Sequence, residues 1–198
     1  MLECLLPTAN AAATLAQPAT YWPARLPRSL VIPETTLWFN LNVTAQRFPH
    51  RTAYQFFGQA LTYAELHRQA EALAGWLQAQ GVKAGDRVLL FMQNCPQYVI
   101  AFYAVQRADA VVVPVNPMNR AEEFGHYIVD PQARVAITMA DLAPIVAEAN
   151  AQVPEALRLQ QVLVARYTDA MPAVIADADA HSPAMLAWLT ADPPLPPG

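Results

Sequence analysis

Short and almost wholly apolar runs alternate with segments of helical periodicity through the middle of this chain. The runs are rich in Val, Leu and Ile, and they lie at Arg87–Met92, Ala110–Val115, Arg134–Thr138 and Gln161–Ala165. A strand that is apolar on both of its faces must be buried on both, and parallel sheets covered by helices bury their strands in this way. The pattern therefore predicts an α/β fold with a mostly parallel, doubly wound sheet and helices on both faces.

The segments between these runs carry helix signals. Asn94–Arg107 has Pro96 in its first turn, where a missing N–H costs little, and its centre is apolar almost all round. We expect neighbouring elements to cover most sides of that helix. Asn119 and Glu122 have the spacing of a capping box at the start of a helix that ends near Asp130, and a further helix is predicted at Asp141–Gln152.

Three more elements are predicted ahead of the first apolar run. A helix over Thr36–Arg47 is capped by Thr35 or Thr36, and Ala53–Phe57 and Gln59–Thr62 form a small hairpin at Gly58. Thr62 and Glu65 then form a capping box. The helix that follows ends at Gly81, and its apolar stripe comprises Leu66, Ala70, Leu73, Ala74 and Leu77.

Prolines crowd both ends of the chain and set the expected domain boundaries. We expect a Pro-rich N-terminal arm at residues 1–33, the α/β unit at 34–170, and a Pro-rich linker or tail at 171–198. The polyproline-like stretch Ala191–Gly198 is followed by no further element, as in a natural tail or in a chain that has been cut short.

Composition excludes several classes of partner. The net charge is −4 and the basic residues are scattered, so no nucleic-acid partner is expected. The longest apolar run, Tyr98–Val105, is far shorter than the roughly 20 residues of a membrane span. An acidic residue near the start argues against a signal peptide, and Cys4 and Cys95 suggest no disulfide framework; a cytoplasmic location is therefore expected.

Ligands of doubly wound sheets bind beyond the carboxyl ends of the strands, and two loops are predicted there. They are Met92–Asn94 and Pro114–Arg120. Arg120 lies at a predicted helix start, where it could hold a phosphate or a carboxylate beside free N–H groups. The same residues are also consistent with a loop that closes on two prolines, with Arg120 as a solvated surface residue.

No catalytic constellation and no metal site are predicted. The four histidines lack the spacing of metal ligands. His67 has the spacing of an ion pair with Glu71, which competes with a role as general base. Cys95 lies at a helix start as a nucleophile would, yet it also has the surroundings of a buried structural cysteine. Glu122 and Glu123 are helix neighbours that point about 100° apart, so they do not form a pair of acids.

Four short segments occur in an order and at a spacing that together are more specific than any one of them alone. Thr62–Leu66 (TYAEL), Gly81–Val88 (GVKAGDRV), Asn94–Gln97 (NCPQ) and Val113–Met118 (VPVNPM) follow one another at this spacing, with two glutamates beyond. In this order they resemble the N-terminal region of adenylate-forming acyl-CoA synthetases, the AMP-binding or ANL superfamily. The resemblance runs from about Thr36 to Ala165, and the stretch Asn116–Arg120 resembles long-chain fatty acid–CoA ligases most.

The resemblance implies the N-terminal subdomain of the acyl-CoA synthetase fold and a parent enzyme that uses ATP, Mg²⁺ and CoA. Such enzymes convert a carboxylate to an acyl-adenylate and then to an acyl-CoA. The loop that holds the ATP phosphates, and the catalytic lysine, come later in the family than the matched region, and Lys83 is not that lysine. The resemblance thus implies that the fragment itself binds no cofactor. Where some family members carry an Arg near CoA this chain has Met118, and Arg120 is the remaining candidate on the CoA side.

Two other functions stay open from the residues alone: a free-standing flavodoxin-like binding module without catalysis, and a small nucleotide-dependent oxidoreductase. The latter lacks any Gly-rich phosphate loop. As partners we expect the rest of the parent chain, and a second copy of this chain bound through exposed apolar surface of the helices, especially Cys95–Arg107.

Overall fold

The computed structural model describes residues 23, 25–27, 29, 31–170 and 181–196, and divides the chain into two compact units. The first unit, Met1–Glu34, contains a turn in which the Leu26 N–H donates to the Pro23 carbonyl. The second unit, Thr35–Gly198, holds the sheet and all the helices described below. The predictions for Cys4 and for residues 171–180 lie outside the described residues.

A four-stranded parallel sheet is the centre of the second unit, as predicted. Its spatial order is β4 (Val111–Val115), β3 (Arg87–Phe91), β5 (Val135–Met139) and β6 (Gln161–Ala165). Of these four strands β3 comes first in the chain, and it lies between β4 and β5. Phe91 of β3 is in register with Val115 on one side and with Thr138 on the other. The chain therefore reverses its winding direction at β3, which makes the sheet doubly wound.

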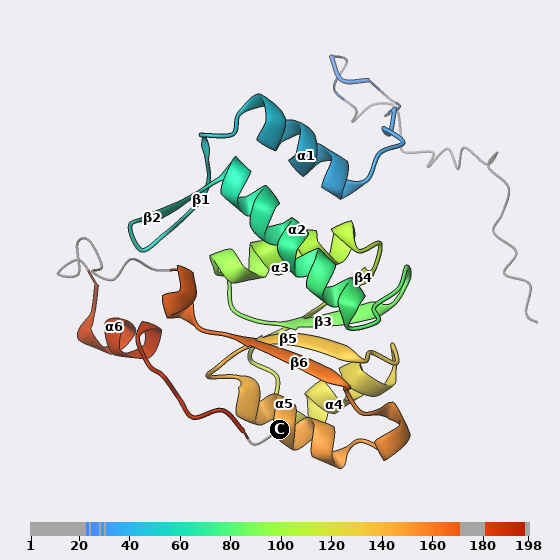
Figure 1. Cartoon of the computed structure of the whole chain (residues 1–198), viewed down its shortest axis with the longest axis vertical. Coiled ribbons are helices and arrows are strands. Elements are labelled where there is room, and N and C mark those ends of the chain that lie inside the picture. The colour runs from blue at the N-terminus through green and yellow to red at the C-terminus, as the bar shows by residue number, and fades with distance from the viewer. Residues whose placement is uncertain (1–22, 24, 28, 30, 171–180, 197–198) are drawn as a thin grey trace, which may run out of the picture. The chain divides into compact units, whose positions relative to one another are not determined.

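Helices cover both faces of this sheet (Figure 1). α1 (Leu37–Arg47), α2 (Tyr63–Ala79) and α3 (Pro96–Arg107) lie on one side of it, and α4 (Ala121–Val129) and α5 (Ala143–Gln152) lie on the other. A two-stranded hairpin, β1 (Thr52–Phe56) and β2 (Gln59–Thr62), leads into α2 through the predicted Thr62–Glu65 capping box. The remaining elements are the 3₁₀ turns η1 (Glu155–Leu157) and η2 (Tyr167–Ala170), and helix α6 (Pro183–Leu189).

Alternation along the strands divides the core into two layers. Val88 and Leu90 of β3 pack toward α2 and α3, whereas Leu89 and Phe91 pack toward α4 and α5. All four side chains are fully buried, which explains why the strand is apolar at every position after Arg87. The fold class predicted from the sequence is confirmed.

Helix α3 is covered by its neighbours. Ala101, Ala104 and Val105 are buried, and its other large side chains, such as Phe102 and Tyr103, are only partly exposed because they pack against the same core. The expectation of an open apolar surface on this helix is therefore wrong: α1 and α2 already cover the sides that the sheet leaves free. Within the described residues, no helix is both long enough and apolar enough to cross a membrane.

Helix α6 is not anticipated by the sequence analysis, which places its residues in a linker. Ser182 caps it by accepting a hydrogen bond from the Met185 N–H, and Pro183 occupies its first turn. Leu189 is fully buried in the layer that contains α2 and α3. The helix therefore belongs to the packed structure.

Candidate functional site

The carboxyl edge of the sheet, where all four strands end, is the candidate site. Both predicted loops lie at this edge, because β3 and β4 run in parallel and end side by side at Phe91 and Val115. The hydroxyl of Thr138 on β5 donates to the Phe91 carbonyl at 2.9 Å and ties β5 to β3 at the point where the winding reverses. Helices α3, α4 and α5 begin at this edge, so the positive ends of three helix dipoles point toward it.

The loop after β4 is a tight turn built by Asn116 and Pro117. The Asn116 side-chain Oδ1 accepts a hydrogen bond from the Met118 N–H at 3.0 Å, and its backbone carbonyl accepts one from the Asn119 N–H at 3.0 Å. Pro117 fits the second position of such a turn. The turn leaves Met118 79% exposed. Arg120 follows with an exposed side chain that has no hydrogen bond or ion pair within the described part of the chain.

The start of α4 corrects one prediction. The N-cap residue is Arg120, not Asn119, and the carboxylate that accepts the N-cap N–H belongs to Glu123, at 2.9 Å, and not to Glu122. The Asn119 N–H already donates to the Asn116 carbonyl, so it is not free to donate to Glu122 as the predicted capping box requires. Because of this shift by one residue, Arg120 is the N-cap of α4, and its exposed guanidinium lies next to the first turn of the helix.

The loop after β3 ends in Cys95, which is fully buried. Its Sγ lies 4.0 Å from the Met139 sulfur. Burial raises the pKa of the Cys95 thiol to about 11, because the charged thiolate is poorly solvated there. A protonated and inaccessible thiol is not a nucleophile at neutral pH, so the structure supports the structural role for Cys95.

A cluster of polar and aromatic side chains lies where β5 and β6 end. The Trp188 ring of α6 stacks on Tyr167 at 4.5 Å between ring centroids, and its Nε1–H donates to Asp141 Oδ2 at 3.1 Å. Arg166, directly after β6, pairs with Asp192 beyond α6. These contacts hold α6 against the carboxyl edge. Sequence analysis missed this cluster, although Ser182 followed by Pro183 is a helix-start signal that would have pointed to α6.

Three buried polar atoms near this cluster have no hydrogen-bond partner among the described residues: Gln97 Oε1, Asp141 Oδ1 and the Tyr167 hydroxyl oxygen. Burial raises the pKa of Tyr167, and the negative charge of Asp141 raises it further. Gln97 also donates from Nε2 to the Arg166 carbonyl at 2.6 Å, which ties the start of α3 to the end of β6.

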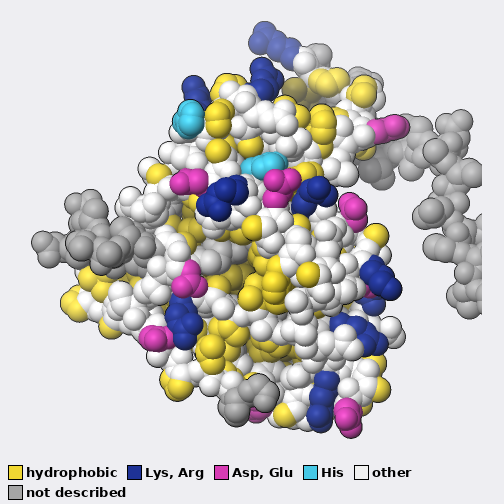
Figure 2. All heavy atoms as spheres, in the orientation of Figure 1, with side chains coloured by type: hydrophobic (Ala, Val, Ile, Leu, Met, Phe, Trp, Pro, Cys, Tyr) yellow, Lys and Arg dark blue, Asp and Glu magenta, His cyan; other side chains and the backbone are white. Residues whose placement is uncertain are grey.

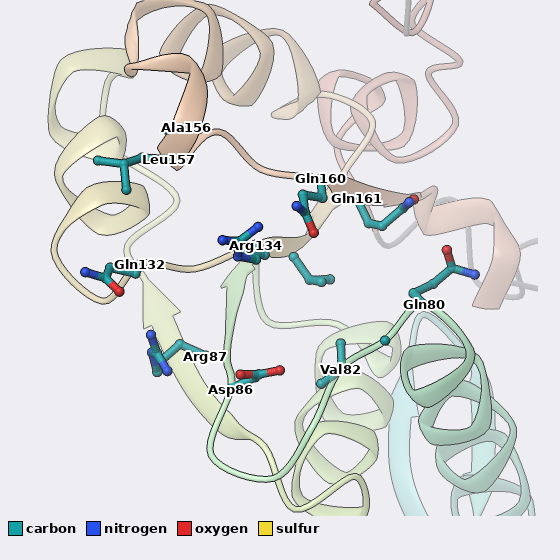
Figure 3. Close-up of a pocket in the computed structure, with 12 residues that line it drawn as sticks. Gln80, Val82, Asp86, Arg87, Gln132, Arg134, Ala156, Leu157, Gln160 and Gln161 are labelled. Atoms are coloured by element: carbon teal, nitrogen blue, oxygen red, sulfur yellow. The ribbon is translucent and has the colours of Figure 1, made fainter.

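A hollow of about 150 Å³ lies at the opposite edge of the sheet, where the strands begin (Figure 3). Figure 3 shows Arg134 and Gln160 on one side of it, with Asp86 and Val82 on the other. Arg87 also lines it, and its Nε donates to the Pro131 carbonyl just beyond the end of α4. Helices α2 and α4 end at this edge, so their dipoles favour cations there. The hydrogen bond from Arg87 therefore satisfies a carbonyl just beyond the end of α4.

The remaining predicted candidates lie elsewhere. His67 on α2 has Nδ1 3.6 Å from Glu71 Oε2 and Nε2 3.0 Å from Asn42 Oδ1, and its ring stacks on Trp38. The predicted pairing of His67 with Glu71 is thus present, and the residue joins α1 to α2 away from the strand ends. Within the described residues, no three His, Cys, Asp or Glu side chains gather where they could hold a metal ion.

Comparison with known proteins gives one consistent result. The family model described as "AMP-binding enzyme" matches residues 41–196. A long-chain-fatty-acid–CoA ligase of Bacillus subtilis is 39% identical over 123 residues, which are 62% of this chain and 22% of the relative. A feruloyl-CoA synthase of an Amycolatopsis species is 42% identical over 103 residues, or 52% of this chain and 21% of the relative. The chain thus spans about a fifth of the length of these two relatives.

Solved structures agree with this. The N-terminal domain of FACL13 from Mycobacterium tuberculosis superimposes with a TM-score of 0.62 at 28% identity, over 66% of this chain and 34% of that one. The resemblance to the N-terminal region of acyl-CoA synthetases is confirmed, and the alternative of a free-standing flavodoxin-like module is not favoured. The chain belongs to the family of AMP-binding enzymes.

Proposed function

We propose that this chain is the N-terminal part of an ATP-dependent acyl-CoA synthetase of the fatty acid–CoA ligase type. The observation that supports the proposal most directly is the family match, because it spans the sheet, the helices on both of its faces and α6. The relatives named above are a fatty acid ligase and a feruloyl ligase. The shared chemistry is the joining of a carboxylic acid to the thiol of CoA.

In the proposed reaction the carboxylate displaces pyrophosphate from ATP, and the acyl group then passes from the adenylate to the CoA thiol with release of AMP. We propose that this chain does not form a nucleotide or Mg²⁺ site by itself. The six glycines of the chain are dispersed and make no phosphate loop, and no acidic cluster is present among the described residues. We therefore assign no chemical step to this chain and propose that the remainder of the enzyme holds ATP and Mg²⁺.

The domain organisation proposed from the sequence fits this role. In this proposal residues 34–170, with α6 packed on them, are the part that the remainder of the enzyme contacts, residues 1–33 are an arm, and the rest of 171–198 leads toward the nucleotide-binding part. Helix α6 is held at the carboxyl edge by Trp188. The linker after α6 thus starts from the edge of the sheet at which ligands of doubly wound folds bind.

Arg120 is the residue that we propose on the CoA side. Its exposed guanidinium has no partner within the described residues, and it lies at the positive end of α4. An exposed contact of this kind contributes about 1 kcal/mol or less after screening. In an enzyme that contains this chain, Arg120→Ala should raise the KM for CoA by up to about fivefold and leave adenylate formation unchanged. Arg134→Ala, an exposed arginine at the opposite edge, is the matched control.

A chimera tests the function itself. Residues 35–170 would replace the matching segment of the Bacillus subtilis ligase, and acyl-CoA formation would be assayed with a long-chain fatty acid and with ferulate. We expect thioester formation with at least one of these acids, and the ratio of the two rates reports which acid class this segment suits. A chimera that folds, as judged by circular dichroism, but that activates neither acid would contradict the proposal.

A further inference from the structure

Two arginines lie side by side at the edge of the sheet where the strands begin. β3 and β5 pair in parallel with Val88 in register with Val135, so Arg87 and Arg134, one residue earlier in each segment, are neighbours across the ladder. By alternation both side chains start toward the layer of α4 and α5, because the residues two further along each strand pack in that layer. Like charges placed next to each other in this way repel.

The two guanidinium groups keep donors free. Arg87 donates from Nε to the Pro131 carbonyl and from Nη1 to the Gly85 carbonyl at 3.2 Å, and these bonds fix its position. Its Nη2 has no hydrogen-bond partner among the described residues, and neither has any nitrogen of the exposed Arg134 guanidinium. Within the same residues, no carboxylate lies at ion-pair distance from either arginine. The repulsion between the two cations is therefore not offset by a paired acid of the described chain.

Both arginines line the hollow of about 150 Å³ at this edge (Figure 3). The amide side chains of Gln132 and Gln160 line it as well and add neutral hydrogen-bond donors. Asp86 is the one acidic residue among the described residues that line it, and its Oδ2 accepts from the Lys83 N–H at 2.8 Å. Because Asp86 directly precedes Arg87, its side chain starts toward the other face of the sheet. The lining thus carries more positive than negative charge.

Cations reach the surface on this side of the molecule. Figure 2 shows Lys and Arg side chains on the side where the strands begin in Figure 1. The carbonyl ends of α2 and α4 favour these cations but attract no anion themselves, so an anion at this edge must be held by direct contact with guanidinium groups. The edge lies opposite the loop that presents Arg120, so a ligand here does not occupy the proposed CoA side.

We propose that this hollow binds a small molecule through a phosphate group held between Arg87 and Arg134. Guanidinium groups form short, charge-assisted hydrogen bonds with phosphate oxygens. A tetrahedral phosphate presents oxygens in several directions, which suits donors that come from two strands and from Gln132, whereas a planar carboxylate engages one guanidinium. The bound anion also offsets the repulsion between the two arginines. A hollow of this size takes a phosphate with a few further atoms, and a whole nucleotide is too large for it.

Titration calorimetry of the whole chain with glycerol phosphate and with inorganic phosphate, at constant ionic strength, tests the proposal. Contacts between exposed charges are weak, so we expect saturable binding with a Kd in the millimolar range. Arg134→Gln removes the charge but keeps a polar side chain, and it should weaken binding by about fivefold or more. Arg68→Gln removes an arginine that is also exposed, on α2 far from this edge, and should leave binding unchanged. Succinate, which carries carboxylates instead, should bind more weakly than either phosphate.

Amide chemical shifts during the phosphate titration give a second readout that does not depend on a variant folding. The backbone amides of Gln132, Arg134 and Gln160 should shift along one saturating curve, and that of Arg120 should not. Shifts centred on Arg120, or equal binding by wild type and Arg134→Gln, would overturn the proposal.

The same response to chloride at matched ionic strength would assign the effect to charge screening and would overturn the proposal as well. None of these measurements needs acyl-CoA formation, which tests the proposed function in the chimera. The phosphate site and the proposed function can therefore fail independently of each other.

Discussion

Phe124 on α4 provides a direct test of how the core layer between the sheet and helices α4 and α5 is held together. Its side chain is fully buried, and its ring lies 4.7 Å from the ring of Phe91 on β3, at an interplanar angle of 47°. This pair fastens α4 to the sheet, and α4 begins at the loop that presents Arg120. Phe124→Ala removes the ring and leaves a cavity between the helix and the sheet.

The expected loss is about 3–5 kcal/mol in the free energy of unfolding, from lost burial and the cavity together. Of this, about 0.5–1.5 kcal/mol belongs to the aromatic pair with Phe91. Domains of this kind are stable by only about 5–15 kcal/mol, so the variant should be close to the limit of folding. At about 2–4 °C per kcal/mol, the Tm should fall by about 6–20 °C.

Urea denaturation followed by circular dichroism measures this loss, with Phe39→Ala as the control. Phe39 on α1 is 48% exposed, and its truncation should cost less than about 1 kcal/mol. Phe124→Leu keeps most of the volume and should show an intermediate loss, which preserves the test if the alanine variant does not fold. Equal losses for Phe124→Ala and Phe39→Ala would refute the packing described for α4.

Three further predictions concern single side chains. Burial raises the pKa of Cys95 to about 11, so its alkylation at pH 8 should be at least about 100-fold slower in the native than in the unfolded protein. For the same reason, the free energy of unfolding should fall as pH rises above about 9. Rapid alkylation of the native protein would contradict the burial of this thiol. Hydrogen bonds from the N-cap of α2 lower the pKa of Glu65, so the stabilisation that they give is present above the ordinary carboxyl pKa and is lost as pH falls through the lowered value. Glu65→Gln should therefore remove this contribution to the acid dependence of the free energy of unfolding. An unaltered dependence of stability on pH would count against the capping box. Trp188→Phe keeps the ring but loses the donor to Asp141, so the amides of α6 should exchange about fivefold faster; unchanged exchange would mean that this hydrogen bond does not hold the helix.

Much of the fold could be predicted because local signals agree with tertiary packing. Thr62 and Glu65 form their capping box as expected, and Gly81 ends α2 with a φ of +87°, a conformation that favours glycine. The strands were predictable because burial on both faces leaves an uninterrupted apolar run, as at Val88–Phe91. These features depend on neighbours within a few residues.

The parts that could not be predicted depend on competition between signals or on distant contacts. Asn119–Glu122 and Arg120–Glu123 have the same spacing, and the turn that begins at Asn116 decides between them by engaging the Asn119 backbone. The carboxyl-edge cluster joins Gln97 and Asp141 to residues of α6 and η2 that are distant in sequence, so no local pattern reveals it. The placement of both predicted loops at one edge, by contrast, follows from parallel strand topology.

Titration calorimetry with Mg-ATP, on the isolated chain and on the chimera with the Bacillus subtilis ligase side by side, tests the central claim most directly. If this chain is a folded part of an AMP-binding enzyme whose nucleotide site is completed by residues elsewhere, the chimera should bind Mg-ATP saturably. The isolated chain should then show no Mg-dependent binding in the micromolar range. Micromolar binding by the isolated chain, or none by a folded chimera, would contradict it.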